Sequence, residues 1–176
     1  MLTPLQEEVA SVIGALPEAQ EFVLAGGAAL ISRGDVDRHT EDLDFFGLDP
    51  TSVDRLLVSV RPALLDAGFE VAVVRASPGF ARLSVERRGE RTEVDLAADA
   101  RLMAPELGPL GKILAGEELA IDKVLAVFGR AEARDFLALA AVEPGYGLAY
   151  LCSRATEKDP GFDLGVSERC FNDLDA

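Results

Sequence analysis

The sequence predicts an α+β fold in which helices flank a small mixed β-sheet and the C-terminal part is helical. Two observations indicate this class. Short apolar or alternating strand segments are interspersed with helical patterns over the first 110 residues, and helical periodicity dominates afterwards. We therefore expect an α/β core at 1–110 and a helical part at 111–176, together forming one compact unit.

The expected elements follow from periodicity and from helix start and stop signals. Thr3 is the predicted N-cap of the first helix, because Pro4 suits the first helical position and Gln6 completes a capping box. Pro62 is expected to kink or split the helix in which it lies. Residues 103–116 contain prolines and glycines and are expected to be irregular. Strands are expected at 21–25, 42–46, 69–74, 80–85 and 91–97, and helices at 4–16, 28–32, 50–67, 117–128, 132–142, 147–156 and 164–174.

The composition excludes several classes of protein. No apolar run approaches the ~20 residues that span a bilayer, and the acidic N-terminus lacks the pattern of a secretory signal. We therefore expect a cytoplasmic protein with no membrane partner. A formal net charge of −14 argues against a plain DNA-binding module. It is compatible with an enzyme that binds metal-complexed NTP, or with a protein that pairs with a basic partner. Cys152 and Cys170 indicate neither a disulfide framework nor a zinc site.

The first candidate site is the Asp42-Leu43-Asp44 segment. Side chains two residues apart on a strand share a face, so both carboxylates point the same way. Carboxylates held side by side repel unless a cation lies between them, and Mg²⁺ prefers carboxylate and phosphate oxygens. The pattern predicts a metal site for phosphoryl or nucleotidyl transfer. The simpler alternative is a half-exposed strand with a charged outer face.

A second alternating segment, Glu93-Val94-Asp95-Leu96, follows on a later strand. Placed beside the first, it makes Asp95 the third predicted metal ligand and a candidate acceptor for the proton of an attacking hydroxyl. Both segments follow a strand–Gly26-Gly27–helix unit in the sequence, and their joint occurrence favours a metal site over a charged outer face. Glycine at that turn lets the backbone approach phosphate closely, although a tight turn alone would also use it.

These residues resemble the DNA polymerase β-like nucleotidyltransferase superfamily, in which Gly-Gly or Gly-Ser precedes an Asp-x-Asp strand. The segment Gly26-Gly27-Ala28-Ala29-Leu30, followed by Arg38-His39-Thr40-Glu41-Asp42-Leu43-Asp44, is similar to the AbiEii/AbiGii toxin family, which includes the mycobacterial MenT toxins. Later segments agree with that family: Asp122-Lys123-Val124-Leu125-Ala126, Arg130-Ala131-Glu132-Ala133-Arg134-Asp135-Phe136 and Lys158-Asp159-Pro160-Gly161-Phe162. The resemblance extends over residues 22–171.

The resemblance implies a nucleotidyltransferase core and a toxin paired with a separate antitoxin protein. It implies NTP as substrate, Mg²⁺ (or Mn²⁺) as cofactor, and transfer of NMP to an acceptor, the tRNA 3′ end in the MenT case. By position, the implied catalytic residues are Asp42, Asp44, Asp95, Lys123 and Asp135, of which the first three bind metal. The implied nucleotide-binding residues are Gly26, Gly27, Thr40, Lys123 and Arg134.

The helical-part residues also have simpler interpretations. Lys123 is either a triphosphate partner or a solvated lysine, and Asp135 orients Lys123 or Arg134 or makes an i,i+4 pair on a helix face. Two other functions are kept open. The same fold could nucleotidylate a protein or a small molecule such as an aminoglycoside, or the chain could be a catalytically inactive binding partner.

Overall fold

The computed structural model describes residues 1–163 and divides the chain into two units, Met1–Ala115 and a second unit that begins at Gly116. The mixed α+β class is confirmed. The predicted helix at 164–174 and Cys170 lie outside the described residues.

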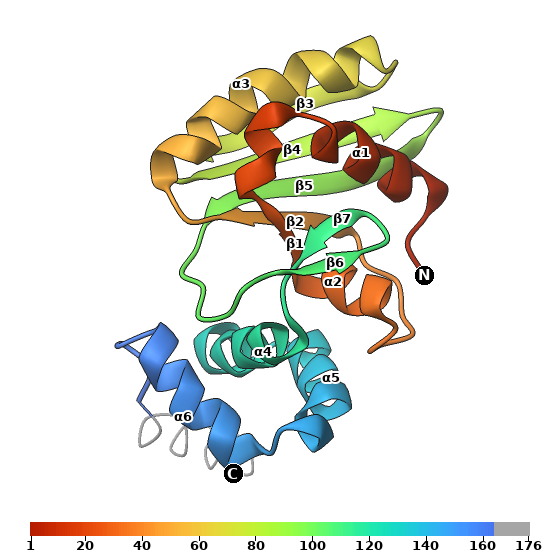
Figure 1. The fold of residues 1–176 in the computed structure, drawn as a ribbon. Helices are drawn as coiled ribbons and strands as arrows, with labels where there is room; N and C mark the ends of the chain where they lie inside the picture. Colours follow the sequence, from red (N-terminus) through yellow and green to blue (C-terminus); the bar gives the residue numbers. More distant parts are fainter. Residues whose placement is uncertain (164–176) are drawn as a thin grey trace. The chain divides into compact units, whose positions relative to one another are not determined.

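The first unit is built on one mixed sheet, which over the described residues has the strand order β3-β4-β5-β2-β1-β7-β6. Parallel pairing joins β2 to β5 and β1 to β7, and the other neighbours are antiparallel. Figure 1 shows this sheet from β3 at one edge to the teal β6–β7 hairpin at the other. The strands are β1 (Val23–Ala25), β2 (Asp42–Gly47), β3 (Glu70–Ser77), β4 (Phe80–Arg87), β5 (Glu90–Ala98), β6 (Glu106–Gly108) and β7 (Gly111–Ile113).

Helices α1 (Pro4–Gly14) and α3 (Pro50–Asp66) cover one face of the sheet, as Figure 1 shows. The capping box predicted at Thr3 is present. Gln6 Nε2 also donates to Thr92 Oγ1 of β5, at 3.3 Å, and so joins α1 to that face. The face is apolar because β2, β4 and β5 alternate at the strand period of two. Its fully buried residues are Leu43, Leu83, Val85, Val94 and Leu96 from the strands and Val9, Ile13, Val53, Leu56, Val60 and Leu64 from the helices.

The opposite face of the same strands carries the charged side chains. The burial of β2 alternates residue by residue, so that Leu43 and Phe45 are buried while Asp42 and Asp44 are half-buried. The predicted meander of β3, β4 and β5 is confirmed, with Arg88 and Gly89 at positive φ in the β4–β5 turn. The short helix α2 (Gly26–Arg33) follows β1 directly and packs against β1 and β2.

Two local expectations were wrong, and one half of a third. Residues 103–116 are not simply irregular, because β6 and β7 form a hairpin there and β7 pairs with β1. Strands of three residues are too short to show a period of two, so their pairing is decided by the neighbouring strand. The strand expected at 21–25 begins at Val23, after a 3-10 turn over Pro17–Glu21. Pro62 does not split α3, which continues through it from Pro50 to Asp66.

The second unit consists of helices around a small apolar core. It contains α4 (Gly116–Arg130), α5 (Ala133–Val142) and α6 (Leu148–Lys158), with a 3-10 turn at Glu143–Gly145. Helix α4 packs against both α5 and α6. The rings of Phe128 and Phe162 meet edge to face with centroids 5.0 Å apart. Lys158 is buried at the end of α6 and pairs with Glu118 (2.8 Å) and Asp122 of α4, which ties α6 to α4.

Among the described helices none is by itself long and apolar enough to cross a bilayer; only the bent pair α5–α6 meets that criterion jointly, on length and composition.

Candidate active site

The two strands that carry the predicted carboxylates are neighbours in the sheet. Strand β2 pairs in parallel with β5, and in this register Asp44 lies directly opposite Asp95 while Asp42 lies opposite Glu93. Partners in a sheet point to the same face, so the three aspartates share the face opposite α1 and α3. The structure therefore brings Asp42, Asp44 and Asp95 together on one surface.

Gly26 begins α2 beside the Asp44 carboxylate. Its φ of +60° is a left-handed conformation, which only glycine adopts without strain. A Cβ at this position would lie 1.8 Å from Asp44 Oδ2, so a side chain cannot be accommodated. The glycine thus lets the Asp44 carboxylate pack directly against the backbone at the start of α2, where the first N–H groups of the helix lie.

Gly27 lies beside two polar side chains of the loop between α2 and β2. A Cβ added there would be 2.9 Å from both Arg38 Nη2 and Thr40 Oγ1. Thr40 Oγ1 donates a hydrogen bond to Asp42 Oδ1 at 2.6 Å. Within residues 1–163 the Arg38 guanidinium has no carboxylate partner, and its buried Nε makes no hydrogen bond. A cation without a counter-ion beside a helix N-terminus is an arrangement suited to binding an anion.

Arg82 of β4 determines the environment of Asp95. Its Nε donates to Asp95 Oδ1 at 2.7 Å and its Nη2 to Oδ2 at 2.6 Å, while Nη1 lies 3.3 Å from Glu93 Oε2. The hydrogen bond to Asp95 outweighs partial burial and raises the pKa of Arg82, so the guanidinium stays charged. Asp95 itself is 6% exposed, and this pairing neutralises a buried carboxylate.

Asp42 and Asp44 have the donor chemistry of a hard divalent cation, because both supply carboxylate oxygens from the same strand face. Asp95 presents both of its oxygens to Arg82, and over residues 1–163 no cluster of three or more His, Cys, Asp or Glu side chains has metal-holding geometry. The pair Asp42–Asp44 therefore fits a cation, and a third ligand remains a prediction.

The candidate residues of the second unit form a separate buried cluster. Lys123 of α4 is 6% exposed, so it is not a solvated lysine, and its Nζ lies 3.3 Å from Asp135 Oδ1. Arg130 donates from Nε to Asp135 Oδ2 at 2.7 Å and from Nη2 to Oδ1 at 2.9 Å. Burial opposes ionisation of Asp135, but Arg130 and Lys123 outweigh it and hold the pKa of this carboxyl below its usual value.

Asp135 thus orients Lys123, one of the two roles predicted for it, but its arginine partner is Arg130 and not Arg134. The guanidinium of Arg134 pairs instead with Glu132 at 2.7 Å, and both side chains are nearly half exposed. A helix begins between Arg130 and Asp135, so their contact depends on the turn at Ala131, where φ is +50°.

Three arginines at these clusters were not predicted as site residues: Arg38, Arg82 and Arg130. Arg38 had a signal, since it stands four residues before Asp42 in the segment that carries the family resemblance. Arg130 had one as well, since it begins the segment Arg130–Phe136 that resembles the family. Arg82 had none, because a charged residue on a strand is ordinarily solvated.

The fold and the sheet face that carries the aspartates define a class of protein. A mixed sheet that bears Asp42 and Asp44 beside a Gly-Gly helix start is the architecture of a nucleotidyltransferase, and the comparisons agree. The structure of JHP933 from Helicobacter pylori aligns with a TM-score of 0.63 at 20% identity, over 87% of this chain and 70% of that one. A putative nucleotidyltransferase from H. pylori aligns with a TM-score of 0.61 at 21% identity, over 87% and 72%. The antibiotic-resistance factor ANT(2'')-Ia aligns with a TM-score of 0.60 at 13% identity, over 86% and 90%. These likenesses show a shared fold.

The sequence identifies the family. Residues 10–137 match the model of the nucleotidyl transferase AbiEii toxin family of type IV toxin–antitoxin systems. The chain belongs to this family, and it is a nucleotidyltransferase whose substrate is an NTP and whose system includes an antitoxin. A comparison with curated protein sequences produced no match.

Proposed function

We propose that this chain is a metal-dependent nucleotidyltransferase toxin that transfers NMP from an NTP to an RNA acceptor, the 3′ end of tRNA, with release of pyrophosphate. The observation that carries the proposal is the direct pairing of Asp44 with Asp95 on the sheet face beside Gly26. Nucleotidyl transfer needs carboxylates next to a phosphate-binding turn, and these residues supply both.

The triphosphate is proposed to bind where α2 begins. Gly26 and Gly27 allow the phosphate oxygens to approach the backbone, and the first N–H groups of α2 are donors. Arg38 contributes a guanidinium that lacks a carboxylate partner among residues 1–163. Thr40 fixes Asp42 by its hydrogen bond and orders this loop. The resemblance implies that Lys123 of the second unit is also an active-site residue, and Asp135 holds its amine in one orientation.

Asp42 and Asp44 are the residues proposed to hold Mg²⁺ or Mn²⁺, with phosphate oxygens completing the ligand set. A bound divalent ion would neutralise charge on the phosphates and lower the pKa of an attacking hydroxyl. Asp95 is proposed to accept the proton of that hydroxyl at its carboxylate. Arg82 holds Asp95 in one orientation through hydrogen bonds to both oxygens, which makes Arg82 a positioning residue.

A small-molecule acceptor is the second candidate, because two structures with this fold are of ANT(2'')-Ia, one of them in complex with adenylyl-2''-tobramycin. An inactive scaffold is not supported, since each predicted acidic catalytic position keeps its carboxylate. We propose that the protein acts in the cytoplasm, because both the NTP and the proposed tRNA acceptor are found there. An antitoxin protein that binds this chain directly is proposed as its partner.

One experiment separates the acceptors. The purified chain is incubated with each α-labelled NTP, Mg²⁺ and bulk tRNA, a protein extract or an aminoglycoside, and labelled products are resolved by class. Label on tRNA that is removed by a 3′ exonuclease supports the proposal. Label on protein or aminoglycoside alone contradicts the tRNA assignment, and label on none of them in Mg²⁺ or Mn²⁺ contradicts the transferase proposal. Asp44→Asn in parallel identifies any contaminating activity.

A further inference from the structure

The catalytic face continues beyond the carboxylates as a row of partnered residues. Asp44 on β2 pairs with Asp95 on β5, Asp95 with Arg82 on β4, and Arg82 with Arg75 on β3. Neighbouring strands are about 4.8 Å apart, so Arg75 lies about 14 Å from Asp44 along this row. The row changes from negative to positive as it leaves β2 and β5.

A β-bulge is the reason that Arg75 belongs to this face. Val73 opposes Leu83 and Arg75 opposes Arg82, so Val74 is an extra residue in β3. Without it Val74 would face Arg82, and Arg75 would face buried Ala81 on the side covered by α3. The bulge therefore moves one guanidinium from the helix side of the sheet to the catalytic side. In residues 1–163 the exposed Arg75 has no carboxylate partner, and its guanidinium carbon lies 5.7 Å from the centre of the Phe80 ring.

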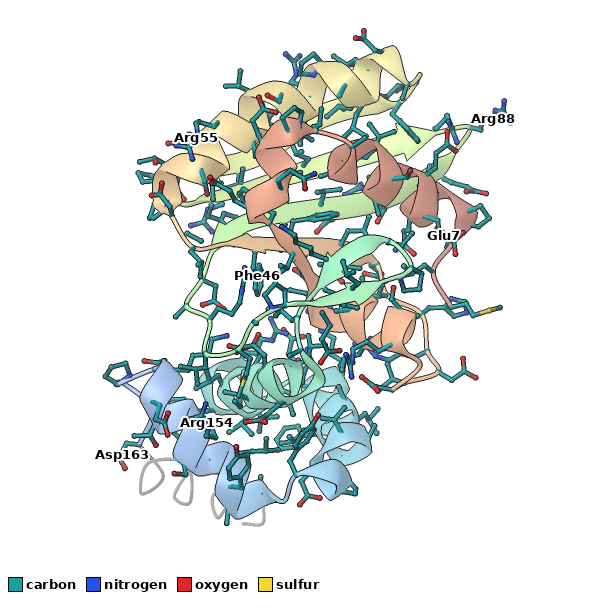
Figure 2. The ribbon with its side chains drawn as sticks, in the orientation of Figure 1. Glu7, Phe46, Arg55, Arg88, Arg154 and Asp163 are labelled. Carbon is teal, nitrogen blue, oxygen red and sulfur yellow. The ribbon has the colours of Figure 1, made fainter. Side chains whose placement is uncertain are left out.

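A second row lies two residues further along the strands from the row of charged residues, and it contains two aromatic side chains. Phe80 on β4 pairs with Ala97 on β5, and Ala97 pairs with Phe46 on β2. All of them are half-buried, so part of each side chain is open. The small Ala97 separates two aromatic side chains that are about 10 Å apart by strand spacing. Figure 2 labels Phe46, which lies on the side of β2 away from α3, and Arg101 Nη2 donates to its carbonyl at 3.2 Å.

We propose that these two rows of residues form a surface that binds the acceptor, and that the acceptor is the single-stranded end of an RNA. We call the set Phe46, Arg75, Phe80 and Ala97 the acceptor platform. Unpaired bases stack on Phe80 and Phe46, since exposed aromatic rings beside arginine are the usual surface for single strands. Arg75 contacts a backbone phosphate while its plane rests on Phe80. The inference rests on the proposed function and names the residues that select its acceptor.

Charge favours RNA over a small polycation. Beyond Asp95 the row ends at Arg75, whose guanidinium attracts a phosphate and repels an amino group. Arg82 is already committed to Asp95 and Glu93, so Arg75 is the cation of the platform that is available to a ligand. A net charge of −14 disfavours binding to a long nucleic acid. A local cation such as Arg75 is compatible with that charge, because contact with one strand end involves few phosphates.

The test is direct binding of a fluorescein-labelled single-stranded RNA, measured by anisotropy over a series of salt concentrations. We expect Phe80→Leu to weaken binding about tenfold with an unchanged salt dependence, because stacking is lost and charge is kept. Arg75→Ala should weaken binding and reduce the slope of log K against log salt by about 0.7, and Arg75→Lys should restore that slope. Arg61 is an exposed residue of α3, on the face of the sheet opposite the platform. Arg61→Ala removes the same charge and should change neither the RNA affinity nor its salt dependence.

Two outcomes overturn the platform. The platform is wrong if the wild type binds RNA no better than the double variant Arg75→Ala/Phe80→Leu, or if both single variants transfer to RNA with the wild-type KM for RNA. We expect a raised KM for RNA and an unchanged KM for NTP. Failure of the proposed function has a different result: no label is transferred from any NTP, while RNA binding still depends on Arg75 and Phe80, which supports the platform as an RNA surface.

Discussion

Gly26 and Asp44 are so close that a Cβ on the glycine would lie 1.8 Å from Asp44 Oδ2. Gly26→Ala should therefore displace the carboxylate and abolish most transfer, and it should also cost about 1–2 kcal/mol of stability, because alanine disfavours the left-handed φ. Gly68→Ala is the matched control, since Gly68 has a φ of +83° and no atom within 4 Å of an added Cβ. If Gly26→Ala and Gly68→Ala lose transfer activity in the same proportion to their loss of stability, the contact between Gly26 and Asp44 is unimportant for transfer.

Replacement of either strand carboxylate should stop the chemistry without unfolding the protein. Asp42→Asn and Asp44→Asn remove charge from a half-buried face, so the melting temperature should stay the same or rise. Transfer in Mg²⁺ should fall below detection, while Asp54→Asn on exposed α3 should retain wild-type activity. A variant with Asn at position 44 that transfers at the wild-type rate would remove Asp44 from the set of metal ligands.

Arg82 and Asp95 should be coupled in stability. Arg82→Gln leaves the Asp95 carboxylate, which is 6% exposed, without its charged partner and should cost about 1–3 kcal/mol. The double variant Arg82→Gln/Asp95→Asn should lose less than the sum of the two single variants, because the neutral amide no longer needs a cation. Urea unfolding of all four proteins measures the coupling, and strict additivity would show that the pair contributes nothing.

The Asp135 cluster should make stability dependent on acid pH. The pKa of Asp135 is lower in the folded chain than in the unfolded one, so its stabilisation is present above the unfolded value and is lost as pH falls through the folded value. The difference in unfolding free energy between wild type and Asp135→Asn should thus be constant from about pH 5 to 8 and shrink below about pH 4. A difference that is the same at all pH values would mean that Asp135 is not held ionised by Arg130 and Lys123.

Divalent ions with NTP should stabilise the fold by mass action. Ligands that bind the native site and not the unfolded chain add about 2.7 kcal/mol at a hundredfold excess over the dissociation constant. Mg²⁺ with NTP should raise the melting temperature more than Mg²⁺ alone, because phosphates supply ligands that Asp42 and Asp44 leave open. NaCl at equal ionic strength controls for screening, and Asp44→Asn should abolish the difference. A shift equal to that in NaCl would contradict the metal–nucleotide site.

The sequence by itself determined the features that depend on local periodicity. The period of two in β2 and β5 was enough to predict that Asp42 and Asp44 share a face, because side-chain direction alternates along any strand. The capping box at Thr3 and the turn between β4 and β5 were likewise predictable, since their geometry is set by residues within a few positions. The family followed from the order of short motifs along the chain.

Only the tertiary structure decided which distant residues meet. A shift of β2 against β5 by two residues would keep every side chain on its face, so the pairing of Asp44 with Asp95 was not readable from alternation. The pairing of Arg82 with Asp95 depends on that register, and the position of Arg75 depends on one extra residue in β3. The hairpin of β6 and β7 exists because β1 offers an open edge to β7, which no pattern within three residues can encode.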